Sequence, residues 1–163
     1  MGFSRIIMPL DVISPSGAET ATLAAGMAKL LNPGDVVFLI GQLGTGKTFF
    51  IRSAAAALGV SEPVTSPSFT MAQTYSGKIT VHHLDLYRLQ NFSAEDALDF
   101  EPFFENDAVT FVEWPEQAQP FIEKPAVIIK LEHLDTSSRR ITFDCEREDL
   151  KKALEDLIAG AGN

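Results

Sequence analysis

Cysteine and long apolar runs are nearly missing from this chain. The 163 residues include a single cysteine, Cys145, so no disulfide can form within the chain. A membrane-spanning helix needs about 18 uninterrupted apolar residues, and no stretch of this chain comes near that length. The segment from Met1 to Leu10 is too short for a secretory signal and lacks its cleavage pattern. These absences predict a protein of the reducing cytoplasm with no membrane partner and no disulfide partner.

Basic residues are also scarce. The chain has 13 Lys and Arg against 22 Asp and Glu, which gives a net charge of −9, and the basic residues are dispersed. Proteins that grip a nucleic acid backbone usually present a basic face. Direct, extended binding of RNA or DNA is therefore disfavoured, and we expect any connection with a nucleic acid to run through a partner protein.

The most specific feature is a glycine-rich stretch with the spacing G-x-x-x-x-G-K-T. It follows the apolar run 36–40, which predicts a buried strand of a parallel sheet. A predicted helix follows it and ends before Gly59. Strand, loop and helix in this order are the context that a phosphate-binding loop (P-loop) requires. The loop consists of Gly41, Gln42, Leu43, Gly44, Thr45, Gly46, Lys47 and Thr48.

These residue types suit the binding of a nucleoside triphosphate. Glycines let successive backbone N–H groups point inward, and with the helix N-terminus they form an anion site. Lys47 is placed to reach the β- and γ-phosphates, and the hydroxyl of Thr48 is placed to bind Mg²⁺. No N-K-x-D sequence for reading guanine occurs, so a GTPase is disfavoured.

Two later apolar strands end in acids that are candidate Mg²⁺ and catalytic residues. Asp85 ends one strand and Glu113 ends another. An acid after a buried strand is typical of the second Mg²⁺ residue in this fold class, and Asp85 competes with Glu113 for that role. His83 shares a strand face with Asp85, and a core histidine is favoured there over a catalytic one. Trp114, the only tryptophan, is read either as a core anchor or as an aromatic next to the nucleotide.

The segment around Thr65, Ser66 and Pro67 allows two interpretations of equal weight. It is either a mobile, switch-like loop that senses the γ-phosphate and Mg²⁺, or an ordinary connection.

The remaining elements follow from periodicity and turn residues. We expect an extended entry segment, two further helices before the C-terminal helix, and four strands besides 36–40 and the one that ends at Glu113. The helices are expected at about 17–31, from Ser93 toward Phe100, and at about 150–160, and the strands at about 69–75, 78–85, 126–134 and 139–145. With no linker or repeat, residues 1–163 are predicted to form a single domain.

The combined pattern resembles the TsaE (formerly YjeE) family of bacterial ATPases over nearly the whole chain. The resemblance rests on the P-loop, on 65–69 with Tyr75 beyond it, on the sequence HLDLYRL at 83–89, and on VEW at 112–114. It implies an α/β P-loop NTPase fold, with a central parallel sheet, antiparallel strands at its sides and flanking helices. It also implies a role in making N6-threonylcarbamoyladenosine, the modified adenosine next to the anticodon in tRNAs that read codons beginning with A.

The resemblance further implies ATP and Mg²⁺ as cofactors and the TsaD and TsaB proteins as partners, with tRNA reached only through them. Thr48 and Glu113 match Mg²⁺ positions, and Asp85 matches an acid needed for hydrolysis. Three further matches that border the nucleotide in such proteins are Glu19, Thr22 and Arg140. Two positions depart from the family pattern: Gln42 stands where Asp is usual, and Ser68 where Thr is frequent.

Three functions are therefore weighed. The leading one is a weak Mg²⁺-dependent ATPase subunit, slow alone and stimulated by a partner complex, with Lys47 stabilising phosphate charge and either Asp85 or Glu113 orienting water. The second is a small-molecule kinase, which needs a basic lid that the six dispersed arginines do not suggest. The third is a non-hydrolysing, nucleotide-dependent assembly switch.

Overall fold

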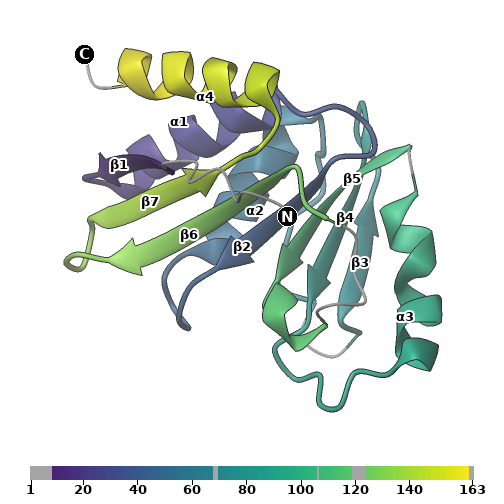
Figure 1. The fold of residues 1–163 in the computed structure, drawn as a ribbon. Coiled ribbons are helices and arrows are strands. Elements are labelled where there is room, and N and C mark those ends of the chain that lie inside the picture. The colour runs from purple at the N-terminus through teal and green to yellow at the C-terminus, as the bar shows by residue number, and fades with distance from the viewer. Residues whose placement is uncertain (1–8, 68–69, 106, 119–123, 162–163) are drawn as a thin grey trace, which may run out of the picture.

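The computed structural model describes residues 9–67, 70–105, 107–118 and 124–161, which form one seven-stranded sheet with helices on both faces (Figure 1). The strand order across the sheet is β1-β7-β6-β2-β5-β4-β3. Ser68 and the entry segment expected before residue 9 lie outside the described residues. The strands are β1 (Leu10–Ser14), β2 (Val36–Ile40), β3 (Ala72–Tyr75), β4 (Thr80–Asp85), β5 (Ala108–Glu113), β6 (Val127–His133) and β7 (Arg139–Asp144).

The four central strands, β6, β2, β5 and β4, are mutually parallel, and the outer strands pair antiparallel. Every position of β5 is buried, as are the first four of β2, because both faces of the central strands are covered. The structure confirms the predicted α/β class, with a parallel centre and antiparallel sides.

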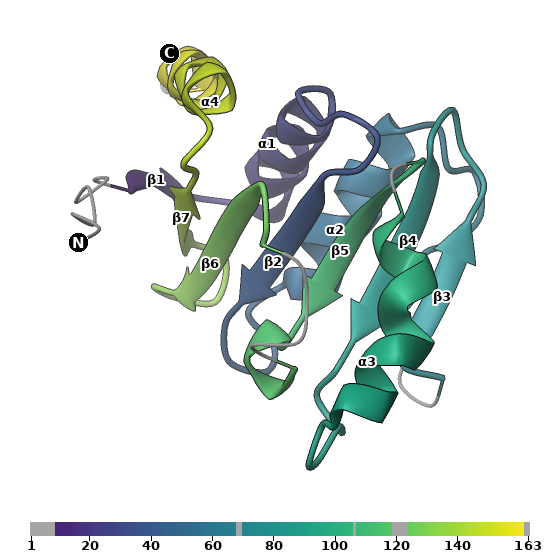
Figure 2. The ribbon, with the colours of Figure 1, turned by 45° about the vertical axis from the view of Figure 1, so that its right-hand side comes forward.

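Three of the helices cover one face and the fourth covers the other (Figure 2). On one face lie α1 (Gly17–Ala28), α2 (Lys47–Ala57) and, outside α1, α4 (Glu148–Ala161). On the other lie α3 (Ala94–Phe100) and the short 3₁₀ helix η1 (Glu101–Phe104), while a second 3₁₀ helix, η2 (Pro115–Gln117), follows β5. No helix in the described part of the chain has both the length and the apolar character needed to cross a membrane.

Helix α1 ends three residues earlier than its apolar periodicity predicts. It begins as expected, with the side chain of Ser16 accepting a hydrogen bond from the N–H of Glu19 at 3.2 Å. At its end, the N–H groups of Leu30 and Leu31 bond to carbonyls three residues back, at 3.0 and 3.1 Å. The apolar pattern continues because Leu31 is still buried in this tight turn, although the α-helix has stopped.

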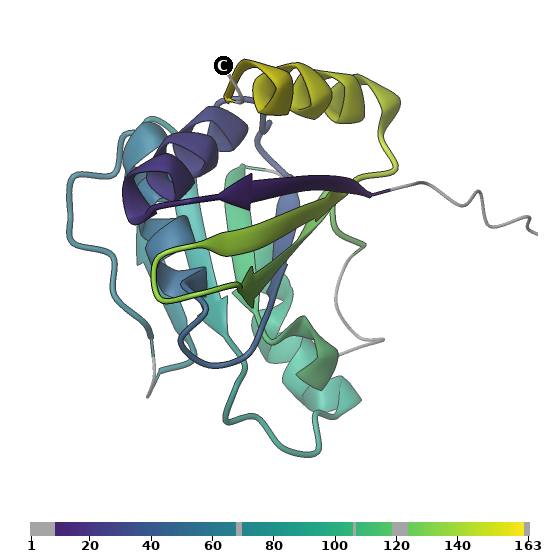
Figure 3. The ribbon, with the colours of Figure 1, turned by 90° about the vertical axis from the view of Figure 1, so that its left-hand side faces the viewer.

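Strand β1 was not predicted. It lies beside β7 at the edge of the sheet (Figure 3), with Val12 opposite Ile141. Its partner is more than a hundred residues away in sequence, so local pattern alone did not reveal the pairing.

Candidate functional site

The glycine-rich loop connects the carboxyl end of β2 to the first turn of α2. Gly46 precedes α2 with a φ of +99°, in the left-handed region that glycine tolerates best. Gly41 faces a close contact, since a Cβ there would lie 2.6 Å from the carbonyl oxygen of Leu131. The loop is thus shaped by glycines at the positions that the phosphate-binding motif specifies.

Lys47 is folded back onto this loop. Its Nζ donates to the carbonyl oxygens of Gly41 at 2.5 Å and of Gln42 at 2.9 Å, and it lies 4.4 Å from the centre of the Trp114 ring. The residue is only 5% exposed. Burial lowers the pKa of Lys47, although the negative charges of nearby carboxylates, Glu113 foremost, raise it in part. To reach a phosphate, Nζ must exchange the two carbonyls for phosphate oxygens.

Glu113 joins the loop to the strand ends. Its carboxylate accepts a hydrogen bond from the Thr48 hydroxyl, with distances of 3.3 and 3.2 Å to the two oxygens. One of these oxygens also lies 2.6 Å from Nε2 of His83. A hydroxyl and a carboxylate are hard oxygen ligands of the kind that Mg²⁺ takes together with phosphate oxygens. The pair therefore fits the predicted metal site.

Asp85 stands directly opposite Glu113 in the parallel pairing of β4 and β5. Its carboxylate accepts hydrogen bonds from the hydroxyl of Ser66 at 2.9 Å and from the N–H of Tyr87 at 3.1 Å. The segment 65–67 is therefore tied to the site through Ser66. A cavity of about 240 Å³ lies here, lined by Leu43, Ser66, Asp85, Tyr87, Arg88 and Trp114.

Trp114 has an uncommon backbone for a bulky residue. Its φ and ψ are 57° and 49°, in the left-handed region, at the start of η2. The ring lies 4.9 Å from that of Tyr87 and also covers Lys47. A strained conformation next to a binding loop is a feature of functional sites rather than of a simple core anchor.

A cleft of about 370 Å³ lies on the α1 side of the loop. Its volume falls in the range of small-molecule pockets. Arg139 closes one wall, with its Nε donating to the Thr45 carbonyl at 3.0 Å. The lining residues are Gly17, Thr20, Thr45, Gly46, Phe49, Thr136, Ser137 and Arg139. The cleft adjoins the P-loop, since Thr45 and Gly46 of the loop belong to its lining.

The three border positions proposed from the family pattern do not line this cleft. Glu19 is exposed on α1, and the Thr22 hydroxyl donates to the carbonyl of Ala18 within the same helix at 3.0 Å. Arg140 points away from the cleft toward Asp11, with 3.9 Å between Nε and the carboxylate. Arg139 takes the cleft position because alternation along β7 puts it on the face of the buried Ile141. That alternation was visible in the sequence and would have singled out Arg139.

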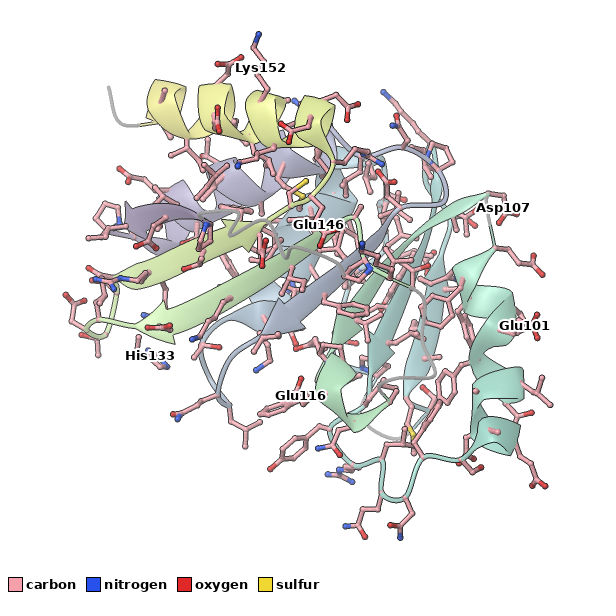
Figure 4. The ribbon with its side chains drawn as sticks, viewed as in Figure 1. Glu101, Asp107, Glu116, His133, Glu146 and Lys152 are labelled. Carbon is pink, nitrogen blue, oxygen red and sulfur yellow. The ribbon has the colours of Figure 1, made fainter. Side chains whose placement is uncertain are left out.

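A further cavity of about 630 Å³ lies on the other side of the loop, between β6 and η2. Figure 4 shows Glu116 and His133, which belong to its lining, at the end of the molecule where β2 stops. Both Gln42 and Leu43 of the loop are exposed at this end. The loop is thus open to approach from several directions.

Comparison with known proteins points to one family. The model of the family described as threonylcarbamoyl adenosine biosynthesis protein TsaE matches residues 14–141. The chain is 36% identical over 132 residues to tRNA threonylcarbamoyladenosine biosynthesis protein TsaE of Treponema pallidum, covering 80% of this chain and 96% of that protein. It is 32% identical over 140 residues to the Bacillus subtilis protein of the same name, covering 85% and 87%. The crystal structure of Bacillus subtilis YdiB superposes with a TM-score of 0.79 at 27% identity, covering 98% of this chain and all of that one.

Proposed function

The chain belongs to the TsaE family, and from that premise we propose that it is the ATP-binding and ATP-hydrolysing subunit in the biosynthesis of threonylcarbamoyladenosine in tRNA. The modified base is the adenosine next to the anticodon in tRNAs that read codons beginning with A. The subunit acts in the cytoplasm on a complex of TsaD and TsaB and meets tRNA only through these partners.

One observation carries the proposal: the contact between Thr48 and Glu113 beside Lys47. It joins the first residue after the loop lysine to the acid at the end of the neighbouring parallel strand. Nucleotide-hydrolysing P-loop proteins place a hydroxyl and an acid at these two positions to hold Mg²⁺. A phosphate-binding loop that served another anion would have no need of this pair.

The protein groups have separate roles in hydrolysis. The loop amides and Lys47 bind the phosphates, and Thr48 and Glu113 would hold Mg²⁺. When bound, the ion neutralises charge that develops on the phosphate oxygens. Asp85 or Glu113 orients the attacking water, and Trp114 shields Lys47 from solvent. Preorganised positive charge around the γ-phosphate is the main source of rate in such sites.

Turnover by the isolated subunit is expected to be slow. Lys47 is held by loop carbonyls, and the carboxylate of Asp85 is held by Ser66 and the Tyr87 amide, so both groups must change partners before reaction. A docked partner that displaces these contacts would accelerate the reaction.

ATP turnover with and without purified TsaD–TsaB complex tests the proposal. We expect slow hydrolysis alone, a marked increase with the complex, and loss of both on Lys47→Ala. Equal and fast rates of ATP hydrolysis in the two conditions would exclude control by the partner. Transfer of the phosphate to a metabolite, without release of inorganic phosphate, would indicate a kinase instead.

A non-hydrolysing assembly switch is the second candidate. It is favoured because both carboxylate oxygens of Asp85 already accept hydrogen bonds, from Ser66 and from the Tyr87 amide, and these contacts compete with a water for the carboxylate. The variant Asp85→Asn keeps the side chain's size and removes its charge. If this variant binds ATP but stops multiple rounds of tRNA modification, hydrolysis is required. Undiminished rounds of modification without hydrolysis would identify the switch.

A further inference from the structure

His83 is the most enclosed ionisable side chain at the site, and no role described above accounts for it. It lies in the middle of β4, is 0% exposed, and shares the α2-facing side of the sheet with Asp85 two residues on. The only hydrogen-bond partner of its ring among the described residues is Glu113, at 2.6 Å from Nε2. Its other ring nitrogen, Nδ1, is buried and has no partner there.

We propose that His83 is a positioning residue that holds the carboxylate of Glu113 in the orientation needed at Thr48. An ionised carboxylate only accepts hydrogen bonds, so the donor in this contact is Nε2–H of His83. Nδ1 has no acceptor among the described residues, so it does not compete for that proton.

A purely structural role explains this arrangement poorly. A buried polar atom without a partner costs free energy, and an apolar side chain of similar size would avoid that cost. His83 packs beside apolar neighbours such as Phe111, which is its partner in the pairing of β4 and β5, so an apolar residue would suit the core. What a histidine provides here, and an apolar residue would not, is the hydrogen bond to Glu113.

The consequence for the site is that the carboxylate of Glu113 is held in one orientation. A glutamate side chain has three rotatable bonds, and two hydrogen bonds, from His83 and from Thr48, fix the end of this one. Partners that orient a metal-binding group are commonly worth about 10–100-fold in metal affinity. The inference rests on the proposed function, because it assigns Glu113 to Mg²⁺.

Two substitutions at His83 separate positioning from packing. His83→Gln keeps an N–H donor that can reach Glu113, whereas His83→Leu fills the space without a donor. His82→Leu is the matched control, because the neighbouring His82 lies on the other face of β4, with its ring 2.9 Å from the hydroxyl of Thr74. Calorimetry gives the affinity for ADP with Mg²⁺ and with chelator, and a melting curve establishes that each variant is folded.

We expect His83→Leu to bind ADP normally in chelator but to lose about tenfold or more of the Mg²⁺-dependent gain. His83→Gln and His82→Leu should keep most of it. An unchanged gain in His83→Leu would overturn the inference while leaving the proposed function intact. Absence of any gain in the wild type would instead refute the Mg²⁺ site of the proposed function.

Nitrogen NMR of the histidine side chains gives a second readout that needs no metal or nucleotide. We expect His83 to be protonated at Nε2 and unprotonated at Nδ1. The opposite tautomer would overturn the inference whatever the binding data show.

Discussion

The ammonium group of Lys47 already donates hydrogen bonds to its own loop. Two carbonyl oxygens and the face of Trp114 surround its ammonium group, and burial lowers its pKa. An incoming phosphate therefore competes with ready-made contacts rather than filling a vacant position. We therefore expect the surroundings of the Trp114 ring to change when Nζ moves.

The first prediction concerns Trp114, whose emission is the only tryptophan signal of the chain. Adding ATP with Mg²⁺ should change its fluorescence, because Nζ leaves its position 4.4 Å from the ring centre. In Lys47→Met the cation is missing, so the starting emission should differ and the change with ATP should be largely lost. An identical response in wild type and Lys47→Met would show that the ring does not sense this lysine.

A second prediction contrasts two adjacent arginines. Arg139→Ala should weaken ATP binding by about tenfold, because it removes one wall of the cleft and the hydrogen bond that holds the Thr45 carbonyl of the loop. Arg140→Ala should change affinity less than about twofold, because its exposed pairing with Asp11 contributes little. Titration calorimetry on both variants measures this, and a larger effect at Arg140 would contradict the assignment of the cleft.

These residues also show where sequence reasoning succeeds. The P-loop and Glu113 could be found because each depends on a few neighbouring residues: glycines at fixed spacing, or an acid after an apolar strand. Arg139 was missed because a family pattern was given priority over the simple alternation of β7. Thr20, buried and 2.6 Å from Ser14 in oxygen–oxygen distance, was missed because its role depends on β1, which was not foreseen.

At the scale of elements, the parallel register of β4 and β5 assembles the site. It sets Asp85 beside Glu113, and the register of β2 with β5 sets Leu39 beside Glu113, one residue before β2 ends and the loop begins. The carboxyl ends of parallel strands meet at one edge of a sheet, and ligands of open α/β sheets bind there. Sequence predicted every strand except β1, but the spatial order of the seven strands depends on long-range packing that no local window contains.

Helix α4 provides the element-scale prediction, since it stabilises the fold at a distance from the site. It packs outside α1, away from the carboxyl end of β2 (Figure 1). Leu154→Ala, at a position that is 0% exposed, should lower the free energy of unfolding by about 2–5 kcal/mol and leave ATP affinity unchanged in the folded protein.

Leu98→Ala on α3 is the matched control for this change. Leu98 is 66% exposed, so its truncation should alter stability by less than about 0.5 kcal/mol. Urea unfolding of both variants measures the difference. Equal effects of the two truncations would show that α4 is not part of the cooperative core.

Across the whole molecule, the negative charge is concentrated rather than spread. Nine of the 22 acidic residues lie between residues 89 and 123, a stretch without lysine or arginine, and the other 13 acids are matched by the 13 basic residues. Figure 4 shows two of the nine, Glu101 and Asp107, projecting outward on the α3 side of the sheet. The excess negative charge of this stretch repels a polyanion, and the rest of the chain has no excess positive charge to attract one.

The final prediction follows from that distribution. The isolated protein should not bind tRNA detectably at micromolar concentration, even at low salt, where electrostatic attraction would be strongest. Mobility-shift assays with tRNA test this, and addition of the TsaD–TsaB complex with ATP should bring the protein into a tRNA-containing band. Binding by the protein alone that weakens as salt is raised would reveal a basic contact surface and contradict the proposal that partners carry the tRNA. A variant with Glu101→Gln and Asp107→Asn removes two of the nine negative charges of the stretch. If repulsion alone prevents contact, this variant should bind tRNA weakly at low salt. If the protein also lacks a complementary surface, it should remain unbound.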